Sequence, residues 1–344
     1  MGRRKSGRPT SIDIAYRAGV SQPTVSRALR GDTSVSAATR ERIESIAREL
    51  NYAVDRNASS LRTQRSDTIA LLIFEDPTPD DSMINPFFVA MLGSITRACA
   101  RQGLDLLVSF QRMEDDWHQR YHDSHRADGL ILLGYGDYQQ YEERLEQLKE
   151  QGTSYARWGS VSSDAGGSTI GSDNFGAGRL AGEHLLERGR RKVAFLGRVD
   201  DNAPEFAQRY RGMIAALEEA GIPPDHALQS DAITTEKAGR AAVSALIAEG
   251  KPFDAVFAAS DLIAIGAMQV LAENGYSVPD DVAVIGFDNI AAASLTTPPL
   301  TTIMQDVQGA GQRLVDMLLA QIEGGERPDP RLETRLIVRG STGG

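Results

Sequence analysis

The chain has 344 residues, of which 41% are hydrophobic and 24% charged, a composition typical of a globular protein with about two to three domains. No apolar run approaches the ~20 residues of a membrane span, and the basic start MGRRKSGRP lacks the apolar stretch of a signal peptide. The single cysteine, Cys99, excludes an internal disulfide framework and indicates a cytoplasmic protein.

Charge is distributed unevenly along the chain. Residues 1–65 contain 13 Lys and Arg against 6 Asp and Glu, a net charge of +7, whereas the remainder carries −17. The positive residues are interleaved with helical core positions, which is not the pattern of a solvated basic tail. This asymmetry predicts a nucleic-acid-binding head on an acidic body.

The segment Ala15–Leu29, AYRAGVSQPTVSRAL, predicts two short helices that meet at a turn. Gly19 can adopt the positive φ that ends the first helix, which we expect to start near a cap at Ser11. Ser21 can cap the second helix, with Pro23 in the first turn, where a missing N–H costs nothing. This pattern is a helix-turn-helix, and the residues of the second helix suited to base edges and phosphates are Gln22, Thr24, Arg27 and Arg30.

A third amphipathic helix, Thr39–Leu50, completes a small three-helix head. It is followed by residues 55–62, DRNASSLR, which are too short and too polar to hold a helix in isolation. Two interpretations stay open for this segment. It is either an exposed linker or a segment that folds only on DNA, with Leu61 as a wedge between base pairs.

From Thr68 onward, apolar strands alternate with amphipathic helices, which predicts parallel sheets covered on both faces. The predicted strands are Thr68–Phe74, Leu104–Phe110, Gly129–Leu133, Ser168–Gly171, Lys192–Gly197, Ala255–Ala259 and Val282–Phe287. The predicted helices lie near residues 87–102, 114–126, 138–150, 175–188, 204–220, 235–249 and 262–274. About 275 residues exceed one such core, so we expect two subdomains. We also expect Thr301–Glu323 to cross back to the first subdomain before Glu333–Val338 returns.

Taken together, these segments resemble the LacI/GalR family of bacterial transcriptional regulators. In the head the match is carried by Ala18-Gly19-Val20-Ser21, Thr24-Val25-Ser26-Arg27, Leu50-Asn51-Tyr52 and Ser60-Leu61-Arg62. In the body it continues through Asn85-Pro86-Phe87-Phe88, Asp173-Asn174, Ser260-Asp261, Gly286-Phe287-Asp288 and Pro299-Leu300-Thr301-Thr302-Ile303. The resemblance spans residues 8–340. It implies an all-α helix-turn-helix head and an α/β periplasmic-binding-protein-like body of two parallel-sheet subdomains.

The resemblance also implies domain boundaries. We expect a helix-turn-helix DNA-binding head at residues 1–53, a hinge helix and linker at 54–66, and an effector-binding and dimerisation body at 67–344. Within the body, the resemblance and the strand pattern place the first subdomain at 67–166 plus 303–325. The second subdomain is expected at 167–300 plus 328–340.

Carried over position by position, Gln22 and Pro23 occupy the two places that decide which operator is read. Because Pro23 has no N–H and no polar tip, we expect Gln22 to do most of the base reading, with adenine suited to its amide. Asp55 stands where an asparagine is common and brings a negative charge near the phosphates. The expected DNA-binding residues are Ser11, Ser21, Gln22, Pro23, Thr24, Ser26, Arg27, Arg30, Thr39, Tyr52, Arg56, Ala58 and Leu61.

In such a body, ligand-binding residues are expected at the carboxyl ends of strands that face the crevice. The resemblance implies Arg209 as a forked donor, and the Asp288 carboxylate can accept hydrogen bonds from two vicinal hydroxyls. Two assignments stay open, because Trp158 either stacks on a ligand or fills the core, and Ser260 either binds or only caps a helix. The expected effector-binding residues are Phe87, Phe88, Trp158, Arg209, Ser260 and Asp288, and the expected effector is a sugar or sugar derivative.

A glycine-rich segment offers an enzymatic alternative. Residues 176–181, GAGRLA, match a dinucleotide fingerprint, which would make the chain an NAD-dependent oxidoreductase. The motif starts in mid-body, however, and close helix packing explains its glycines more economically. A second alternative, a secreted sugar receptor without a DNA role, is disfavoured by the basic head and the absent signal peptide.

A histidine-rich segment raises the question of a metal site. His118, His122 and His125 have helical spacing, with Asp115 and Asp123 nearby. Because their face would be solvated and no cysteine or HExxH pattern supports a site, the sequence favours a charged surface cluster. We therefore expect no metal, no cofactor and, since no catalytic triad or carboxylate pair can be assembled, no enzyme.

The sequence as a whole predicts an effector-responsive regulator, most readily a repressor, acting on double-stranded DNA. Two heads are expected to read a near-palindromic operator while paired hinges kink its centre. The chain ends at Gly344 without a leucine-heptad tail, so we expect a homodimer rather than a tetramer.

Overall fold

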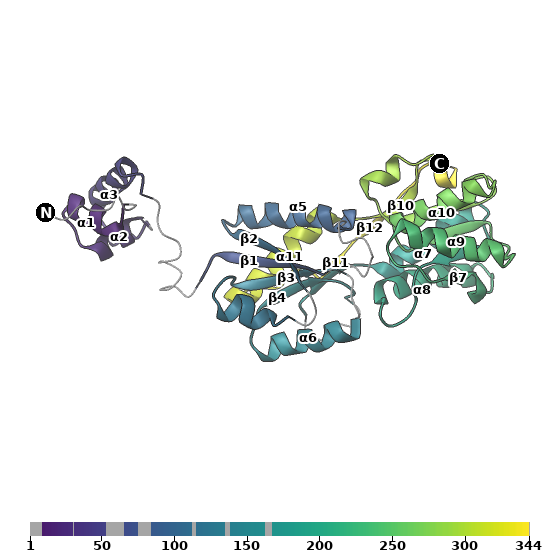
Figure 1. Cartoon of the computed structure of the whole chain (residues 1–344), viewed down its shortest axis with the longest axis horizontal. Coiled ribbons are helices and arrows are strands. Elements are labelled where there is room, and N and C mark those ends of the chain that lie inside the picture. The colour runs from purple at the N-terminus through teal and green to yellow at the C-terminus, as the bar shows by residue number, and fades with distance from the viewer. Residues whose placement is uncertain are drawn as a thin grey trace. The chain divides into compact units, whose positions relative to one another are not determined.

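The computed structural model describes residues 9–29, 31–52, 65–74, 84–111, 115–134, 138–161 and 167–343. The chain forms two units, Met1–Ser66 and Asp67–Gly344 (Figure 1). Each unit has its own apolar core. None of the described helices is long and apolar enough to cross a membrane.

The first unit packs three described helices around a small core. They are α1 (Ser11–Ala18), α2 (Gln22–Leu29) and α3 (Ala37–Glu49). Their small side chains let the helices approach closely, and the buried residues are Ile14, Ala15, Ala18, Val25, Ala28, Val35, Ile43 and Ala47. The third helix begins two residues before the predicted start, because Ser36 caps it by accepting from the N–H of Thr39.

The start of α1 differs from the prediction. Thr10, not Ser11, is the cap: its hydroxyl accepts from the N–H of Asp13 (3.4 Å), and the Asp13 carboxylate accepts from the N–H of Thr10 (2.9 Å). Ser11 is the first helical residue. Gly19 ends the helix with φ of 60°, the left-handed conformation that the sequence predicted.

The second unit is built on two six-stranded sheets. In the first sheet the strand order is β11-β5-β4-β3-β1-β2 and every pair is parallel. Its strands are β1 (Thr68–Phe74), β2 (Asp105–Gln111), β3 (Gly129–Leu133), β4 (Tyr155–Trp158), β5 (Thr169–Ser172) and β11 (Arg331–Leu332). Around it lie α5 (Pro86–Arg101), α6 (Tyr138–Glu150), α11 (Val307–Glu323) and a π-helical turn, η1 (His118–Asp123). We call this the first subdomain.

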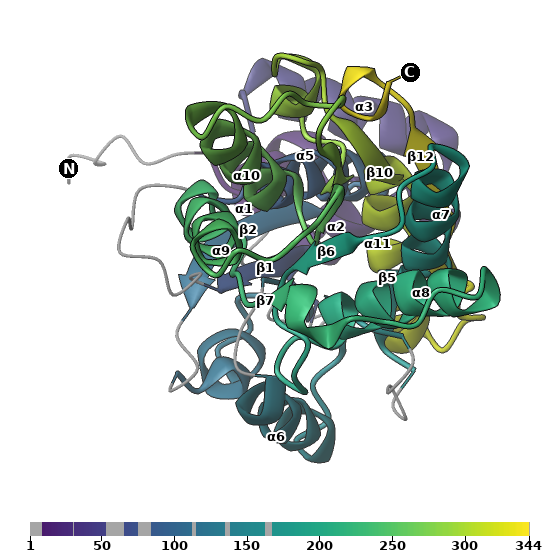
Figure 2. The same cartoon turned by 90° about the vertical axis from the view of Figure 1, so that its right-hand side faces the viewer.

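The second sheet, the basis of the second subdomain, has the strand order β12-β10-β9-β8-β6-β7, with only β12 antiparallel. Its strands are β6 (Val193–Leu196), β7 (Gln229–Ser230), β8 (Ala255–Ala258), β9 (Ala283–Asp288), β10 (Thr301–Gln305) and β12 (Thr334–Ile337). Its helices are α7 (Asn174–Glu187), α8 (Pro204–Glu219), α9 (Glu236–Ala248), α10 (Asp261–Glu273) and the short η2 (His226–Leu228), η3 (Ala291–Ser294) and η4 (Gly340–Thr342). Figure 2 shows α7 and α8 on one face of this sheet and α9 and α10 on the other.

The chain passes between the subdomains three times, after β5, after β10 and after β11. The expected division differs from this arrangement. Residues 167–300 and 328–340 were assigned to the second subdomain, yet β5 and β11 pair in the first sheet. Residues 303–325 were assigned to the first subdomain, and α11 does pack there against α5, but β10 pairs in the second sheet. Partner strands, rather than chain order, decide the division.

Close helix packing explains the glycine-rich segment of α7. A Cβ on Gly178 would lie 2.0 Å from the carbonyl oxygen of Arg209 on α8, and one on Gly212 would lie 2.0 Å from the carbonyl oxygen of Phe175. The two helix backbones therefore touch where these residues lack side chains. This is the packing that the sequence favoured over a dinucleotide site.

Candidate functional site

The first turn of α2 and the residue before it form an exposed surface of the head. Gln22, Pro23 and Arg27 are exposed, as is Ser21 just before the helix. In a helix-turn-helix, the amino-terminal residues of the second helix contact base edges. The structure thus presents the predicted reading residues on the surface that such a contact requires.

Several polar side chains of this face are held by one another. The Gln22 amide donates to the Ser11 hydroxyl (2.9 Å), and the Arg27 Nε donates to the carbonyl oxygen of Pro23 (3.4 Å). The Ser21 and Thr24 hydroxyls form a hydrogen bond of 2.9 Å. These hydrogen bonds favour one arrangement of the side chains, which reduces the entropy lost on binding.

The other predicted DNA-binding residues divide into two groups. Ser26, Thr39 and Tyr52 are half-buried within the head. Arg30, Arg56, Ala58 and Leu61 lie outside the described residues. Two large side chains of α1, Tyr16 (89% exposed) and Ile12 (63% exposed), also lie on the surface of the head, and the sequence analysis did not place either there.

In the body, Asp288 ends β9 and lies at the centre of the candidate ligand site. It is 5% exposed and has φ of 109°, an uncommon conformation for a residue with a side chain. Burial raises the pKa of its carboxyl to about 7, although Arg209 and a hydrogen bond from Gln305 act to lower it. Asp288 therefore titrates near neutral pH.

Arg209, on α8, is 2% exposed and lies beside Asp288. Its guanidinium stacks 3.5 Å from the centroid of the Phe287 ring, its Nε donates to Asn174 Oδ1 (2.8 Å), and its Nη1 donates to the carbonyl oxygen of Ala259. The stack and the two hydrogen bonds hold its planar fork in one orientation. Arg209, implied by the resemblance, and Asp288, predicted from its place at a strand end, are thus brought together.

Gln305, which the sequence analysis did not single out, connects Asp288 to the other subdomain. Its amide nitrogen donates to Asp288 Oδ1 (2.7 Å), and its amide oxygen accepts from the Ser172 hydroxyl on β5 (2.7 Å). Asn174 continues the chain of contacts, donating to the carbonyl oxygen of Ser172 (3.1 Å). We call Ser172, Asn174, Arg209, Asp288 and Gln305 the crossing network, because it lies where β5 and β10 lead from one subdomain to the other.

A second buried carboxylate supports this network. Asp261 is fully buried, and it accepts from the Thr302 hydroxyl (2.6 Å) and from the N–H of Ile290 (2.8 Å). Burial and the nearby charge of Asp288 raise the pKa of Asp261 well above its usual range. The adjacent Ser260, a predicted effector residue, caps α10 by accepting from the N–H of Ile263 (3.3 Å) and is 1% exposed.

The predicted aromatic residues pack together inside the first subdomain. Phe87 contacts Phe88 (ring centroids 5.4 Å apart) and Trp158 (5.8 Å), and all three rings are buried. In the structure all three are core residues. The sequence analysis allowed a core position for Trp158 as one of two alternatives, but it expected Phe87 and Phe88 only as effector-binding residues. Nearby, Asn85 caps α5, and its buried Nδ2 makes no hydrogen bond within the described residues.

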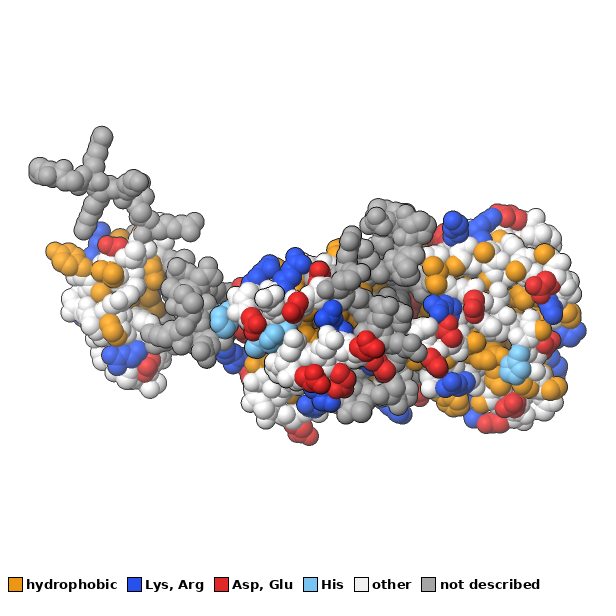
Figure 3. Space-filling model, turned by 60° about the horizontal axis from the view of Figure 1, so that its bottom comes forward, with side chains coloured by type: hydrophobic (Ala, Val, Ile, Leu, Met, Phe, Trp, Pro, Cys, Tyr) orange, Lys and Arg blue, Asp and Glu red, His pale blue; other side chains and the backbone are white. Residues whose placement is uncertain are grey.

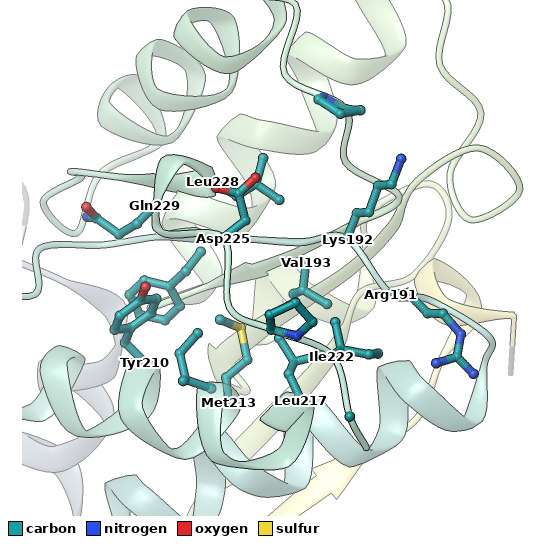
Figure 4. A pocket seen from close by; sticks show the side chains of 15 residues that line it. Arg191, Lys192, Val193, Tyr210, Met213, Leu217, Ile222, Asp225, Leu228 and Gln229 are labelled. Carbon is teal, nitrogen blue, oxygen red and sulfur yellow. The ribbon is translucent and has the colours of Figure 1, made fainter. Parts of the chain in front are cut away.

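A polar cavity of about 330 Å³ adjoins the crossing network. Both subdomains contribute to it, and its lining residues are Ser160, Val161, Ser172, Asp173, Asn174, Phe175, Gln208 and Arg331. A different cavity of about 350 Å³ lies on the second subdomain between α8 and β6, where Tyr210, Met213 and Leu217 face Val193 (Figure 4). None of the residues lining that second cavity belongs to the crossing network.

Comparison with known proteins identifies the family. Residues 12–55 match the bacterial regulatory proteins of the lacI family, and residues 183–342 match the periplasmic binding protein-like domain. The HTH-type transcriptional regulator CelR of Thermobifida fusca is 34% identical over 349 residues, which cover 99% of this chain and 100% of that protein.

Two solved structures extend the likeness to the fold. The CelR–cellobiose complex has a TM-score of 0.71 and 32% identity and covers 97% of this chain and 100% of that chain. The lac repressor dimer bound to operator and the anti-inducer ONPF has a TM-score of 0.80 and 27% identity, with 98% and 99% covered. These findings confirm the predicted fold class and support the regulator over the dehydrogenase and receptor alternatives. The chain therefore belongs to the lacI family of bacterial regulatory proteins and is a DNA-binding transcriptional regulator.

Proposed function

We propose that this regulator is a repressor whose operator affinity is controlled by a small sugar bound between the two subdomains. The observation that carries this proposal is the crossing network, in which a carboxyl and a guanidinium lie buried together and two further members, Ser172 and Asn174, line a polar cavity. A sugar's vicinal hydroxyls can donate to Asp288 and accept from Arg209. The cellobiose complex of CelR supports a sugar as the class of effector.

The proposed output is the head, at residues 1–53, joined by a hinge segment at 54–66. As a cytoplasmic homodimer, two heads would contact two halves of a near-palindromic operator. Gln22 and Arg27 supply base-edge donors, and Leu61 is the proposed wedge in the minor groove. The residues proposed to contact phosphates are Ser21, Ser26, Thr39 and Tyr52. The proposed role of the body is ligand binding rather than catalysis.

The proposed coupling acts through the three chain crossings. A ligand that takes the hydrogen-bonding capacity of Asp288 competes with Gln305 and so alters the link from Gln305 to Ser172. Because the two subdomains share these crossings, a change in this link changes how they close on each other. Such coupling must be reciprocal. If bound operator DNA lowers the affinity for sugar by some factor, bound sugar lowers the affinity for the operator by the same factor.

The test begins with a thermal-shift screen of the full chain against cellobiose, ribose, other sugars and nucleosides. A sugar that raises the Tm is then added to the protein bound to its operator, isolated from genomic DNA fragments by affinity selection. We expect the sugar to change operator affinity about 5- to 150-fold, the usual range for allosteric coupling. Fluorescence anisotropy of the labelled operator measures this change.

The control variants separate the head from the site. Asp288→Asn should abolish the response to sugar while operator binding survives, and Glu249→Gln, an exposed change at the end of α9, should leave both intact. A sugar response that persists in Asp288→Asn would contradict the proposed site. A protein that binds no DNA fragment selectively would contradict the proposed function.

A further inference from the structure

A group of metal-ligating side chains lies on η1, outside the crossing network. His118, His122 and Asp123 each offer one ligand atom, and these atoms all lie within 4.8 Å of one another. Histidine side chains gather at the surface of the first subdomain (Figure 3). His125, the third histidine of the segment, is exposed and is not part of the group.

The π-helical form of η1 is what brings the three side chains together. In an α-helix, a residue five positions on points about 140° away around the helix axis, so Asp123 would leave the face of His118. In a π-turn, which is wider, residues four and five positions on lie on either side of the first one. The turn therefore places His122 and Asp123 on the same face as His118.

The separations of the ligand atoms suit a tetrahedral metal ion. The Nε2 atom of His118 lies 3.1 Å from Asp123 Oδ1, and the Nδ1 atom of His122 lies 3.7 Å from the same oxygen. Metal–ligand bonds of about 2.0–2.1 Å place neighbouring ligand atoms of a tetrahedral Zn²⁺ about 3.3–3.4 Å apart. The two observed distances lie on either side of this value.

Thr153 orients the first histidine for ligation. Its hydroxyl is hydrogen-bonded to His118 Nδ1 at 2.6 Å, and the residue is 4% exposed. When Nδ1 donates to this oxygen, Nε2 can give its lone pair to a metal ion, which then takes the place of the proton shared in the pair of His118 with Asp123. A ligating histidine in proteins is almost always fixed in this way through its other nitrogen.

The second histidine has an unused nitrogen. His122 Nδ1 is shielded from solvent and makes no hydrogen bond within the described residues. The ring stacks on that of His118, with centroids 4.9 Å apart and planes 19° from parallel. Because lone pairs of stacked rings do not converge, the His122 ring has to tilt to share a metal. Its side chain is 43% exposed and free to do so.

We propose that His118, His122 and Asp123 bind one divalent transition-metal ion, Zn²⁺ by preference, with water completing the coordination. Two imidazoles and one carboxylate are a ligand set that suits Zn²⁺, and three protein ligands with an open fourth position are common for it. The site lies on η1, which precedes β3 in the chain, and Asp128 is the residue just before β3. The Asp128 carboxylate accepts from the N–H of Asp67, the first residue of the body.

The test is a calorimetric titration of ZnCl₂ into the full chain, prepared without a histidine tag and freed of metal with a chelator. We expect one Zn²⁺ per chain. His122→Ala and Asp123→Asn should each raise the Kd more than about tenfold, since each removes one of three ligands. His125→Ala, which removes a histidine from the same segment but not from the group, should leave the Kd unchanged.

A fourth variant tests the geometry rather than the ligand count. Thr153→Val keeps the volume but removes the hydroxyl, and we expect it to raise the Kd about tenfold. Thermal unfolding without metal verifies that each variant folds, and if one ligand variant does not, the other serves. No saturable Zn²⁺ binding by the wild type, or equal binding by both ligand variants and the wild type, would overturn the proposal.

Discussion

Asp288 combines two properties that suit the ligand-binding role proposed for it. It ends a strand at the junction of two subdomains, and its burial raises its pKa to about 7. The ionised form only accepts hydrogen bonds, whereas the protonated form also donates one. Effector hydroxyls that donate to Asp288 should therefore bind more tightly as the pH rises through neutrality.

The raised pKa also predicts how stability depends on pH. The folded pKa of about 7 exceeds the ordinary 3.8, so folded Asp288 keeps a proton that the unfolded chain releases. Its stabilising contribution is complete below the unfolded pKa and is lost as the pH rises through the folded pKa. Asp261, whose pKa is also raised, acts in the same direction.

Asp288→Asn tests this relation, because the amide cannot ionise. When the pH rises from about 6 to about 8, the Tm of the variant should fall by less than the Tm of the wild type. Differential scanning calorimetry at both pH values makes the comparison. Equal losses in the two proteins would show that Asp288 does not titrate in this range.

At the scale of elements, the contact of α7 with α8 depends on two glycines. Gly178→Ala would place a methyl group against the carbonyl oxygen of Arg209, so we expect a loss of about 1–3 kcal/mol in the free energy of unfolding. Gly93→Ala in α5 is the matched control, since a Cβ added at Gly93 would have no other atom within 4 Å. That change should stabilise by about 0.5–1 kcal/mol. Urea unfolding measures both, and a tolerated Gly178→Ala would contradict the close packing.

The crossing strands make a second prediction. Gln305→Ala removes the hydrogen bonds of the Ser172 hydroxyl and of Asp288 Oδ1, while Arg209 stays beside Asp288. The loss of these two bonds should together cost about 1–3 kcal/mol. Gln321→Ala is the control, because the hydrogen bonds of Gln321 among the described residues go to the backbone of Tyr155 and to Ser168 Oγ, all within the first subdomain. Both variants should lose stability, but only Gln305→Ala should change sugar affinity. Isothermal titration with the effector decides this, and equal sugar affinities in the two variants would exclude Gln305 from the coupling.

Local sequence patterns predicted where the strands lie better than they predicted which strands pair with one another. Apolar runs such as Thr68–Phe74 and Gly129–Leu133 became strands with those bounds, because fully buried strands leave a continuous hydrophobic signal. β4 was not predicted, as its four residues include the polar Arg157. The assignment of β5 and β11 to the second subdomain was also wrong, because pairing between residues far apart in sequence leaves no local pattern.

The same distinction holds for the site. Asp288 was found from its place at a strand end, and Arg209 only through the family resemblance. Gln305 and Ser172 were missed because their importance arises from a contact between two sheets, which no spacing along the chain encodes. Phe87 and Phe88 carry an aromatic signal that the core and a sugar site share.

At the scale of the whole molecule, charge separates the two units. The basic first 65 residues and the acidic remainder predict that operator affinity depends steeply on salt whereas sugar binding does not. A head and hinge that make about six to ten phosphate contacts should lose about 10³- to 10⁵-fold in operator affinity between about 50 and about 200 mM salt. Anisotropy titrations at several salt concentrations give the slope, and a flat response would refute the electrostatic contribution.

Cys99 has a practical consequence for measuring the proposed closing of the two subdomains. It is the only cysteine in the sequence and is buried in α5, where desolvation raises the pKa of its thiol to about 11. Since the thiolate is the reactive form, Cys99 should not react with maleimide dyes near neutral pH. Cysteines introduced on exposed turns of α6 and α9 would then carry fluorophores at chosen places only. Energy transfer between them would follow the closing of the two subdomains in a chain that needs no background cysteine removed.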